Sequence, residues 1–329
     1  MPPYCRVAPA GPGPGPANVR APVTRRTTTA RRRRGHDDGE PSGATGPVGS
    51  GRRRPCETGP GGGVHRVHQV HLPLGIIEVN TGCNLDCPIC FADSGRQPDG
   101  YSITHEQCAA MLDTFVASEG EAEVVMFSGG EPTIHKHILD FIDLAQARPI
   151  RNVTVNTNGI RLATDTNFVA ELGKRNRTPG RSVNIYLQFD GFEERTHLEI
   201  RGRDLRTLKQ RALDTCAEAG LTVTLVAAVE RGLNEHELGD IIEYGIDHPA
   251  VRSVAFQPVT HSGRHVEFDP LQRLTNPDVI RLINAQRPQW FTKGDFFPVP
   301  CCFPTCRSVT YLLVEGNPAT APSSPSRAC

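Results

Sequence analysis

The run Gly75-Ile-Ile-Glu-Val-Asn-Thr-Gly-Cys83-Asn-Leu-Asp-Cys87-Pro-Ile-Cys90 joins a short apolar segment to a loop with three cysteines. Its first five residues are mostly apolar and β-branched, as in the buried strands of parallel sheets. The C-x3-C-x2-C spacing then brings three thiols onto one loop. Ligands of α/β proteins bind at the carboxyl ends of the strands, so we expect a functional site at this loop.

Three thiolates at this spacing can hold one metal centre, and two kinds of centre fit. A closed structural zinc site needs a fourth ligand, and the nearest downstream candidates, His105 and Cys108, are not at the expected spacing. Iron–sulfur clusters are held by cysteines at similarly short spacings, and three ligands leave one iron of a four-iron cluster open. A disulfide fits poorly, because three thiols are an odd number and residues 1–64 lack the apolar segment expected of a secretory signal. The spacing favours iron–sulfur and leaves zinc as the alternative.

The rest of the chain, from the first strand onward, alternates short apolar runs with helical patterns. The expected strands are Gly75–Val79, Glu123–Phe127, Asn152–Asn156, Ser182–Phe189, Leu221–Val229 and Val251–Pro258. The expected helices are 104–115, which opens with a Thr104–Gln107 capping box, then 138–145, 162–172, 205–216, which Gly220 ends, and 235–244. Six β–α repeats with right-handed crossovers predict an α/β barrel or a doubly wound sheet.

A second motif, Ser128-Gly-Gly-Glu131-Pro-Thr, follows the second expected strand. A Gly-Gly pair lets the backbone approach a ligand without a Cβ clash, and a neighbouring carboxylate can accept hydrogen bonds from an ammonium group. In isolation, such a sequence is most often a simple turn. It lies roughly 40 residues after the cysteines, a spacing that a strand–helix–strand unit supplies.

Together these two motifs resemble the radical S-adenosylmethionine (radical SAM) superfamily, whose signature is CxxxCxxC after the first barrel strand. The resemblance covers residues 75–270 and implies an α/β fold, a partial (β/α)6 barrel. It implies that Cys83, Cys87 and Cys90 bind a 4Fe–4S cluster whose open iron chelates SAM. The implied reaction is reductive cleavage of SAM to a 5′-deoxyadenosyl radical, which functionalises an unreactive C–H bond by methylation or C–C coupling.

The resemblance also assigns residues to the SAM site. Ser128, Gly129, Gly130 and Glu131 match the motif that positions the SAM amino group. Asn158, at the end of the third strand, borders the same site. Arg201 is expected to pair with the SAM carboxylate, and the alternative is a surface ion-pair cluster of this region, which holds Glu193, Glu194, Arg195 and Glu199.

A further group of thiols, Cys301, Cys302 and Cys306, lies near the end of the chain. Adjacent thiols in a reducing cell need a reason, so we expect an auxiliary iron–sulfur or metal site, with simple packing thiols as the alternative. With the core motifs, this group resembles the subgroup that contains pterin-methylating and tetraether-lipid-coupling enzymes. Cys108 and Cys216 lie on apolar helical faces and are expected in the core.

The composition divides the chain. It holds 36 Lys+Arg and 36 Asp+Glu residues, yet residues 1–64 hold 11 Arg and 4 acidic residues with no Leu, Ile, Phe or Trp. We expect residues 1–64 to be a disordered tail, 75–270 the barrel, 271–315 an extension with the auxiliary site, and 316–329 disordered. Both ends are hypothesised to be out-of-frame or truncated sequence of a longer enzyme.

The same features set expectations for partners. The acidic body excludes nucleic-acid binding by bulk charge, and no apolar run is long enough to span a bilayer. We expect a cytoplasmic enzyme with a small-molecule or lipid substrate and a reducing partner such as ferredoxin or flavodoxin. The alternatives are a non-enzymatic iron–sulfur or zinc binding module and an inactive truncated fragment.

Overall fold

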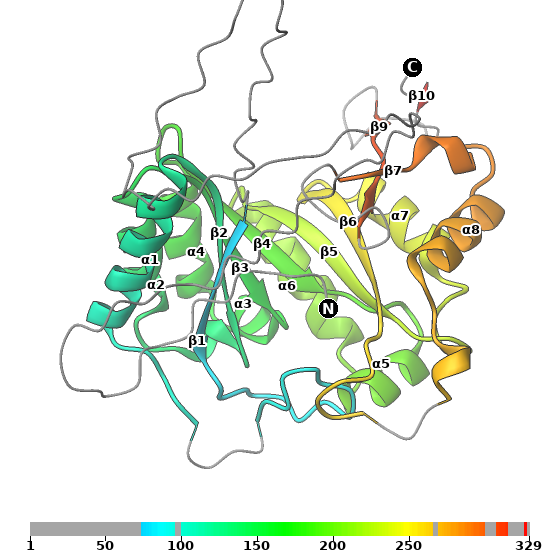
Figure 1. Cartoon of the computed structure of the whole chain (residues 1–329), viewed down its shortest axis with the longest axis horizontal. Helices are drawn as coiled ribbons and strands as arrows, with labels where there is room; N and C mark the ends of the chain where they lie inside the picture. The colour runs from blue at the N-terminus through cyan, green and yellow to red at the C-terminus, as the bar shows by residue number, and fades with distance from the viewer. Residues whose placement is uncertain (1–73, 96–99, 266–268, 300–306, 315–325, 328–329) are drawn as a thin grey trace, which may run out of the picture. The chain divides into compact units, whose positions relative to one another are not determined.

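A computed structural model describes residues 74–95, 100–265, 269–299, 307–314 and 326–327. Six parallel strands form one sheet in the consecutive order β1-β2-β3-β4-β5-β6, which Figure 1 shows as a progression of colour from blue to yellow. These strands are β1 Leu74–Asn80, β2 Ala122–Gly129, β3 Ile150–Thr157, β4 Ser182–Gln188, β5 Thr222–Val229 and β6 Val251–Pro258. Each of the six predicted strands is therefore confirmed.

The consecutive order decides between the two predicted architectures. A doubly wound sheet reverses its strand order at a switch point, whereas a barrel keeps it, so the sheet is that of a partial (β/α)6 barrel. The two faces of the sheet differ in burial. On β4, Val183, Ile185 and Leu187 are fully buried against the helices, while Tyr186 and Gln188 are half-buried on the inner face. The inner face is thus the one on which a ligand can bind.

Helices connect the strands and cover one face of the sheet. They are α1 His105–Glu119, α2 Ile138–Gln146, α3 Ile160–Thr164, α4 Thr166–Asn176, α5 Glu194–Arg201, α6 Arg206–Glu218, α7 Leu238–Asp247 and α8 Asn276–Gln286, with the short 3-10 turns η1 Pro132–Ile134, η2 Pro270–Gln272 and η3 Lys293–Asp295. The predicted capping box of Thr104 and Gln107 opens α1. Cys108 and Cys216 are fully buried, as predicted.

Three features of the helices differ from the sequence prediction. The expected helix 162–172 is two helices, because Asp165 ends α3 and caps α4 by accepting a 3.0 Å hydrogen bond from the Phe168 amide. Helix α5 was not predicted, since few of its residues are apolar. Helix α8 was also missed, although Thr275 and Asp278 form a capping box before it.

The segment after β6 packs on the same core as the sheet. Val279 and Ile283 of α8 and the following Trp290 and Phe291 are buried in the hydrophobic cluster that contains the strands. The remaining short strands are β7 Phe297–Pro298, β8 Ser308–Val309, β9 Leu312–Leu313 and β10 Ser326–Arg327. The boundaries predicted for 1–64, 271–315 and 316–329 stay predictions, and residues 1–64 lie outside the described part. None of the described helices has the length and apolar character to cross a membrane.

Candidate active site

The three cysteines lie on the loop that leaves β1, and their thiols are free. Cys87 is buried, and Cys83 and Cys90 are half-buried. The backbone amides of Leu85 and Ser94 donate 3.4 Å hydrogen bonds to the sulfurs of Cys83 and Cys90. Burial is the main cause that raises the pKa of Cys83 to about 11, and the Cys87 and Cys90 thiols act in the same direction. The ionisation of Cys83 therefore depends on the charges of the other two thiols.

The spacing of these sulfurs bears on the choice between zinc and a cluster. A single zinc ion with Zn–S bonds of about 2.3 Å holds its sulfur ligands about 3.8 Å apart. Among the described residues, one group of three His, Cys, Asp or Glu side chains brings its ligand atoms within 4.8 Å of one another, and the cysteines are not in it. The wider spacing fits thiolates that each bind a different iron of a cluster.

Arg264, from the loop after β6, fixes the conformation of the cysteine loop. Two backbone hydrogen bonds of 2.8 Å pair it with Cys90. Its guanidinium donates to the carbonyl oxygens of Cys87 at 2.7 Å and Ser94 at 3.0 Å, and to the Asp93 carboxylate at 2.8 Å. The side chain is only 11% exposed. Arg264 thus holds the cysteine loop by both its main chain and its side chain, although it lies 177 positions after Cys87 in the sequence.

Gly263 makes this close approach sterically feasible. Its φ of +70° lies in the left-handed region that glycine adopts without strain. A Cβ at this position would overlap the carbonyl oxygens of Cys90 and Phe91. The contact between the two loops therefore requires glycine immediately before Arg264.

The Cys87 thiol also lies beside a buried ion pair. Arg201, the last residue of α5, donates two 2.6 Å hydrogen bonds to Asp190 and another to the Cys87 sulfur. Asp190 is fully buried, and the Arg201 side chain is 13% exposed. Burial raises the pKa of Asp190, but the charge and hydrogen bonds of Arg201, together with the Lys209 charge and the hydrogen bond from the Ala228 amide, outweigh it and the pKa is lowered overall. The pair therefore places a fixed positive charge next to one of the three thiols.

A chain of hydrogen bonds extends from this pair across the carboxyl ends of the strands. Arg201 donates to Gln188 at the end of β4, Gln188 donates to Asn156 of β3, and Asn156 donates to the Ser128 hydroxyl of β2. Each of these bonds is 3.0 Å long. Ser128 of the second motif and the guanidinium beside Cys87 thus belong to one polar network on the inner face.

Glu131 is at the centre of a second, fully buried network. Its carboxylate accepts hydrogen bonds from the Thr133 amide (3.1 Å) and hydroxyl (2.6 Å), the Thr157 hydroxyl (2.7 Å) and the Asn158 amide (2.7 Å). It is 1% exposed. Burial raises its pKa, and the hydrogen bonds from Asn158 and the threonines oppose the rise. This carboxylate joins the ends of β2 and β3, a positioning role that was not predicted.

The Gly129–Gly130 pair lies against the start of the cysteine loop. A Cβ on Gly130 would overlap the Gly82 carbonyl oxygen, and one on Gly129 would overlap that of Asn80. The Gly130 amide donates to Asn80 and the Glu131 amide to Gly82, both at 2.9 Å. The two glycines therefore allow the main chain after β2 to pack closely against the main chain of Asn80 and Gly82.

Asn158 connects the end of β3 to the cysteine loop. Its side-chain amide donates a 2.7 Å hydrogen bond to Asn84, which lies next to Cys83. Its carbonyl oxygen accepts a 2.6 Å hydrogen bond from the ammonium group of Lys209, which is fully buried. Burial is the main cause that lowers the pKa of Lys209 to about 8.

A family model described as the Radical SAM superfamily matches residues 77–245, which include the end of β1, the cysteine loop, the second motif and strands β2 to β5. The chain belongs to the radical SAM superfamily. The enzymes of this superfamily use a 4Fe–4S cluster and SAM, and the predicted family and fold are confirmed.

Curated radical SAM relatives differ in what they do. The chain is 35% identical over 254 residues to 7,8-dihydro-6-hydroxymethylpterin dimethyltransferase of Methanocaldococcus jannaschii. The alignment covers 76% of this chain and 49% of that protein. It is 27% identical over 206 residues to a probable GTP 3′,8-cyclase of Thermoplasma volcanium, with 60% of each covered. The chain thus spans about half to three fifths of the length of these relatives.

A solved structure shares the fold at lower sequence identity. It is a tagged form of anSMEcpe with bound AdoMet and superimposes with a TM-score of 0.51 at 18% identity, covering 66% of this chain and 57% of that one. At this level the likeness concerns the fold alone.

The structure brings most of the predicted site residues of this radical SAM enzyme to one end of the sheet. The cysteine loop contacts Arg201 through Cys87, the Gly129–Gly130 pair through Gly82, and Asn158 through Asn84. Arg201 pairs with Asp190 rather than with the exposed cluster, in which Arg195 bonds Glu199 at 2.6 Å. Contacts of these residues with SAM stay predictions. Cys301, Cys302 and Cys306 lie outside the described residues.

Sequence reasoning missed two residues of the site. Arg264 is far from the cysteines in sequence, and no local spacing connects it to them. Asp190, which follows β4, was not predicted as the partner of Arg201. A buried acidic residue at the end of an apolar strand is the signal that could have pointed to a cationic partner.

Proposed function

We propose that Cys83, Cys87 and Cys90 hold the 4Fe–4S cluster of this enzyme, and that its reductive cleavage of SAM functionalises an unreactive C–H bond of a small molecule. The observation that carries the proposal is the cysteine loop itself. Its three thiols follow β1 at the carboxyl end of the sheet, fixed by Arg264 and contacted by the Arg201 guanidinium. When bound, the cluster and SAM would supply a carbon-centred radical.

The residues of this chain would contribute position and charge. Arg264 holds the main chain of the cysteine loop, so the thiols are presented in one arrangement. The Arg201 charge favours the thiolate form of Cys87, against the burial that raises its pKa. The helix-covered face of the sheet excludes water from one side, which leaves the inner face for SAM and substrate.

Ser128, Gly129, Gly130, Glu131, Asn158 and Arg201 are proposed to form the SAM side of the site. The buried network supports different roles for these residues. The Glu131 carboxylate already accepts four hydrogen bonds from the protein, so we assign it to holding the Gly-Gly backbone and the β3 end in place. Ser128 accepts a hydrogen bond from the Asn156 side chain and faces the inner side of the sheet.

We propose methylation of a polar, pterin-like substrate as the specific reaction. The 35% identity to the pterin dimethyltransferase supports it. The inner face of the sheet also supports a polar substrate over a lipid, because it carries Asn184, Tyr186 and Gln188 on β4 and Gln257 on β6. The Gln257 amide donates a 3.0 Å hydrogen bond to the Tyr186 hydroxyl. A low-potential ferredoxin or flavodoxin is the proposed electron donor, and the cytoplasm the proposed location.

Anaerobic reconstitution tests the class of reaction on the full chain. The protein is loaded with iron and sulfide, reduced with dithionite and given SAM, and 5′-deoxyadenosine is quantified. We expect its formation to fall to background in Cys87→Ala and to persist in Cys108→Ala, a matched change of a buried cysteine in α1. No 5′-deoxyadenosine from cluster-loaded protein, or equal amounts from Cys87→Ala, would refute the proposal.

The substrate is tested separately with a reduced pterin in the same assay. We expect one SAM to be cleaved to methionine and 5′-deoxyadenosine, which carries away a hydrogen atom of the pterin, and a second SAM to donate the methyl group that replaces it, with dithionite supplying the electrons. Mass spectrometry should then show a pterin in which a methyl group has replaced one hydrogen. A turnover of SAM that leaves the pterin mass unchanged would reject the pterin and leave the radical SAM assignment intact.

A further inference from the structure

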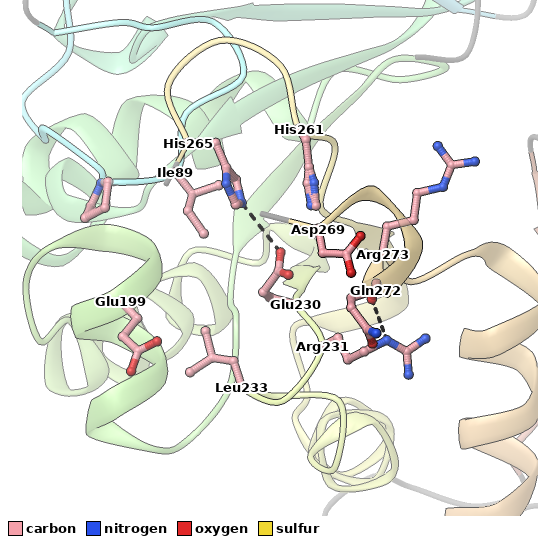
Figure 2. Close-up of a pocket in the computed structure, with 11 residues that line it drawn as sticks. Ile89, Glu199, Glu230, Arg231, Leu233, His261, His265, Asp269, Gln272 and Arg273 are labelled. Carbon is pink, nitrogen blue, oxygen red and sulfur yellow. Dashed lines mark hydrogen bonds and ion pairs between the residues drawn. The ribbon is translucent and has the colours of Figure 1, made fainter. Parts of the chain in front are cut away.

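Three metal-ligating side chains converge outside the cysteine loop. Glu230 follows β5 directly, and His261 and His265 lie in the loop after β6. One ligand atom from each of the three lies within 4.8 Å of the other two. Figure 2 shows the three side chains directed toward one another from these two loops.

The scaffold of this group is well fixed. A 3.0 Å backbone hydrogen bond joins Val259 to Val229, so the two loops leave their strands side by side. Arg264, immediately before His265, is bonded to the cysteine loop through its main chain and its guanidinium. The contacts that fix the cysteine loop therefore also fix the main chain next to His265, and the Val259–Val229 bond aligns the starts of the two loops.

The distances within the group suit a shared cation better than a direct contact. The Glu230 carboxylate and the His265 Nε2 are 3.7 Å apart, which is within ion-pair distance but longer than an ordinary hydrogen bond. The two imidazole rings meet edge to face, with centroids 4.5 Å apart. Ligands that bind one ion at bond lengths of about 2.0–2.1 Å lie roughly 3.3 Å apart in a tetrahedral arrangement, which is close to the carboxylate–imidazole distance observed.

We infer that Glu230, His261 and His265 bind one divalent first-row transition-metal ion of the zinc or ferrous class. Two imidazoles and one carboxylate are ligands of intermediate softness, which suit these ions better than magnesium or calcium. Three protein ligands leave at least one coordination position open.

Glu230, His261 and His265 line a pocket of about 620 Å³. Pro88 and Ile89, which lie between the second and third cysteines of the cysteine loop, line the same pocket. A metal ion in this group would therefore present its free position to the cavity that the cysteine loop borders. The ligand expected there is water or an oxygen or nitrogen atom of a bound small molecule.

Nearby cations do not occupy the site. Arg231 also lines the pocket, but its guanidinium donates a 2.5 Å hydrogen bond to the Gln272 carbonyl and lies 3.8 Å from the Asp278 carboxylate. Figure 2 shows the guanidinium groups of Arg231 and Arg273 directed away from the two histidines. Their charges are thus on the rim of the pocket rather than among the ligating atoms.

Zinc is the probe for the test, on full-length, cluster-loaded protein. The protein is incubated anaerobically with zinc, dialysed, and analysed for metal content and by X-ray absorption at the zinc edge, where the cluster irons do not contribute. We expect one additional zinc per chain with nitrogen and oxygen neighbours at about 2.0–2.1 Å. The additional zinc should be lost in His265→Ala and in Glu230→Gln, which keeps the shape of the side chain.

His236→Ala is the matched control. His236 also pairs with a carboxylate, that of Glu193 at 2.9 Å, but it is exposed and lies outside the group. This variant should retain the zinc. Zinc content that is the same in wild type, Glu230→Gln and His265→Ala would overturn the inference. So would a zinc with sulfur neighbours at about 2.3 Å, because cysteines would then hold it. Iron content and circular dichroism identify any variant that has lost its fold.

Discussion

The guanidinium of Arg201 donates two hydrogen bonds of 2.6 Å to the carboxylate of Asp190, and neither side chain is appreciably exposed. The same guanidinium bonds the Cys87 sulfur. A bidentate arrangement in a buried site is both strong and directional. The pair therefore couples the stability of the barrel to the environment of one cysteine of the predicted cluster.

Asp190→Asn should be strongly destabilising. Removal of one partner leaves the Arg201 charge buried without its counter-charge, which costs about 3–5 kcal/mol. The free energy of unfolding in urea measures this loss. The matched control is Glu199→Gln, because Glu199 pairs with Arg195 at the same 2.6 Å distance on an exposed surface, where a pair contributes about 0–1 kcal/mol. Equal effects of the two substitutions would contradict the assignment of a buried, structurally important pair.

Arg264→Lys should weaken retention of the cluster while preserving the charge. Lysine cannot reproduce the fork that bonds the Cys87 and Ser94 carbonyls and the Asp93 carboxylate together. Loss of such an outer contact typically costs roughly 10–100-fold in metal affinity. The rate of iron release to a chelator from cluster-loaded protein measures the effect.

Arg252→Lys is the control for this substitution, since Arg252 donates only to backbone carbonyls at the start of β6, away from the cysteine loop. It should release iron at the wild-type rate. If Arg264→Lys also did so, the guanidinium would not be what holds the loop.

Gly263→Ala should separate steric overlap from backbone strain. Gly232 has nearly the same conformation, with φ of +73° against +70°, but no atom lies within 4 Å of where its Cβ would be. Gly232→Ala should therefore cost only the left-handed strain of about 1–2 kcal/mol. Gly263→Ala should cost more and also reduce iron content, because its Cβ would push Cys90 and Phe91 away. Equal unfolding free energies and iron contents would show that the loops can separate freely.

The sequence predicted the six strands well, because buried parallel strands are short apolar runs that stand out between polar helices. It also placed the cysteine loop and the Ser128–Glu131 motif at strand ends, where the structure has them. Helix α5 was not predicted, because its charged residues resemble an exposed cluster of ion pairs. Of its Arg and Glu residues only Arg201 turns inward, where it pairs with Asp190 at the end of β4.

The contacts that shape the site were harder to predict, because they join segments far apart in the chain. Arg264 reaches the cysteine loop across most of the barrel sequence. The Gly129–Gly130 pair was read as room for a ligand, and the structure fills that room with the Gly82 and Asn80 carbonyl groups. A local pattern shows that close approach is needed, but only the fold shows which group approaches.

Lys209 should make the stability of this protein depend on pH in the alkaline range. Burial lowers its pKa from the ordinary 10.5 to about 8 in the folded state. Between these two values the unfolded chain holds a proton that the folded chain has released, so the free energy of unfolding rises as pH increases from 8 to 10.5. A difference of this size corresponds to about 3 kcal/mol in total. The stabilising effect is complete above pH 10.5 and is lost as pH falls through 8.

Lys209→Met tests this by removing the titrating group while keeping an unbranched side chain of similar length. Urea unfolding at pH 7.5, 8.5 and 9.5 should show the wild type gaining stability relative to the variant with each step, because only the wild type contains Lys209. The variant also loses the 2.6 Å hydrogen bond to the Asn158 carbonyl, but that loss shifts its whole pH profile by a constant amount. The slope therefore isolates the ionisation, and parallel profiles for the two proteins would show that Lys209 keeps an ordinary pKa in the folded state.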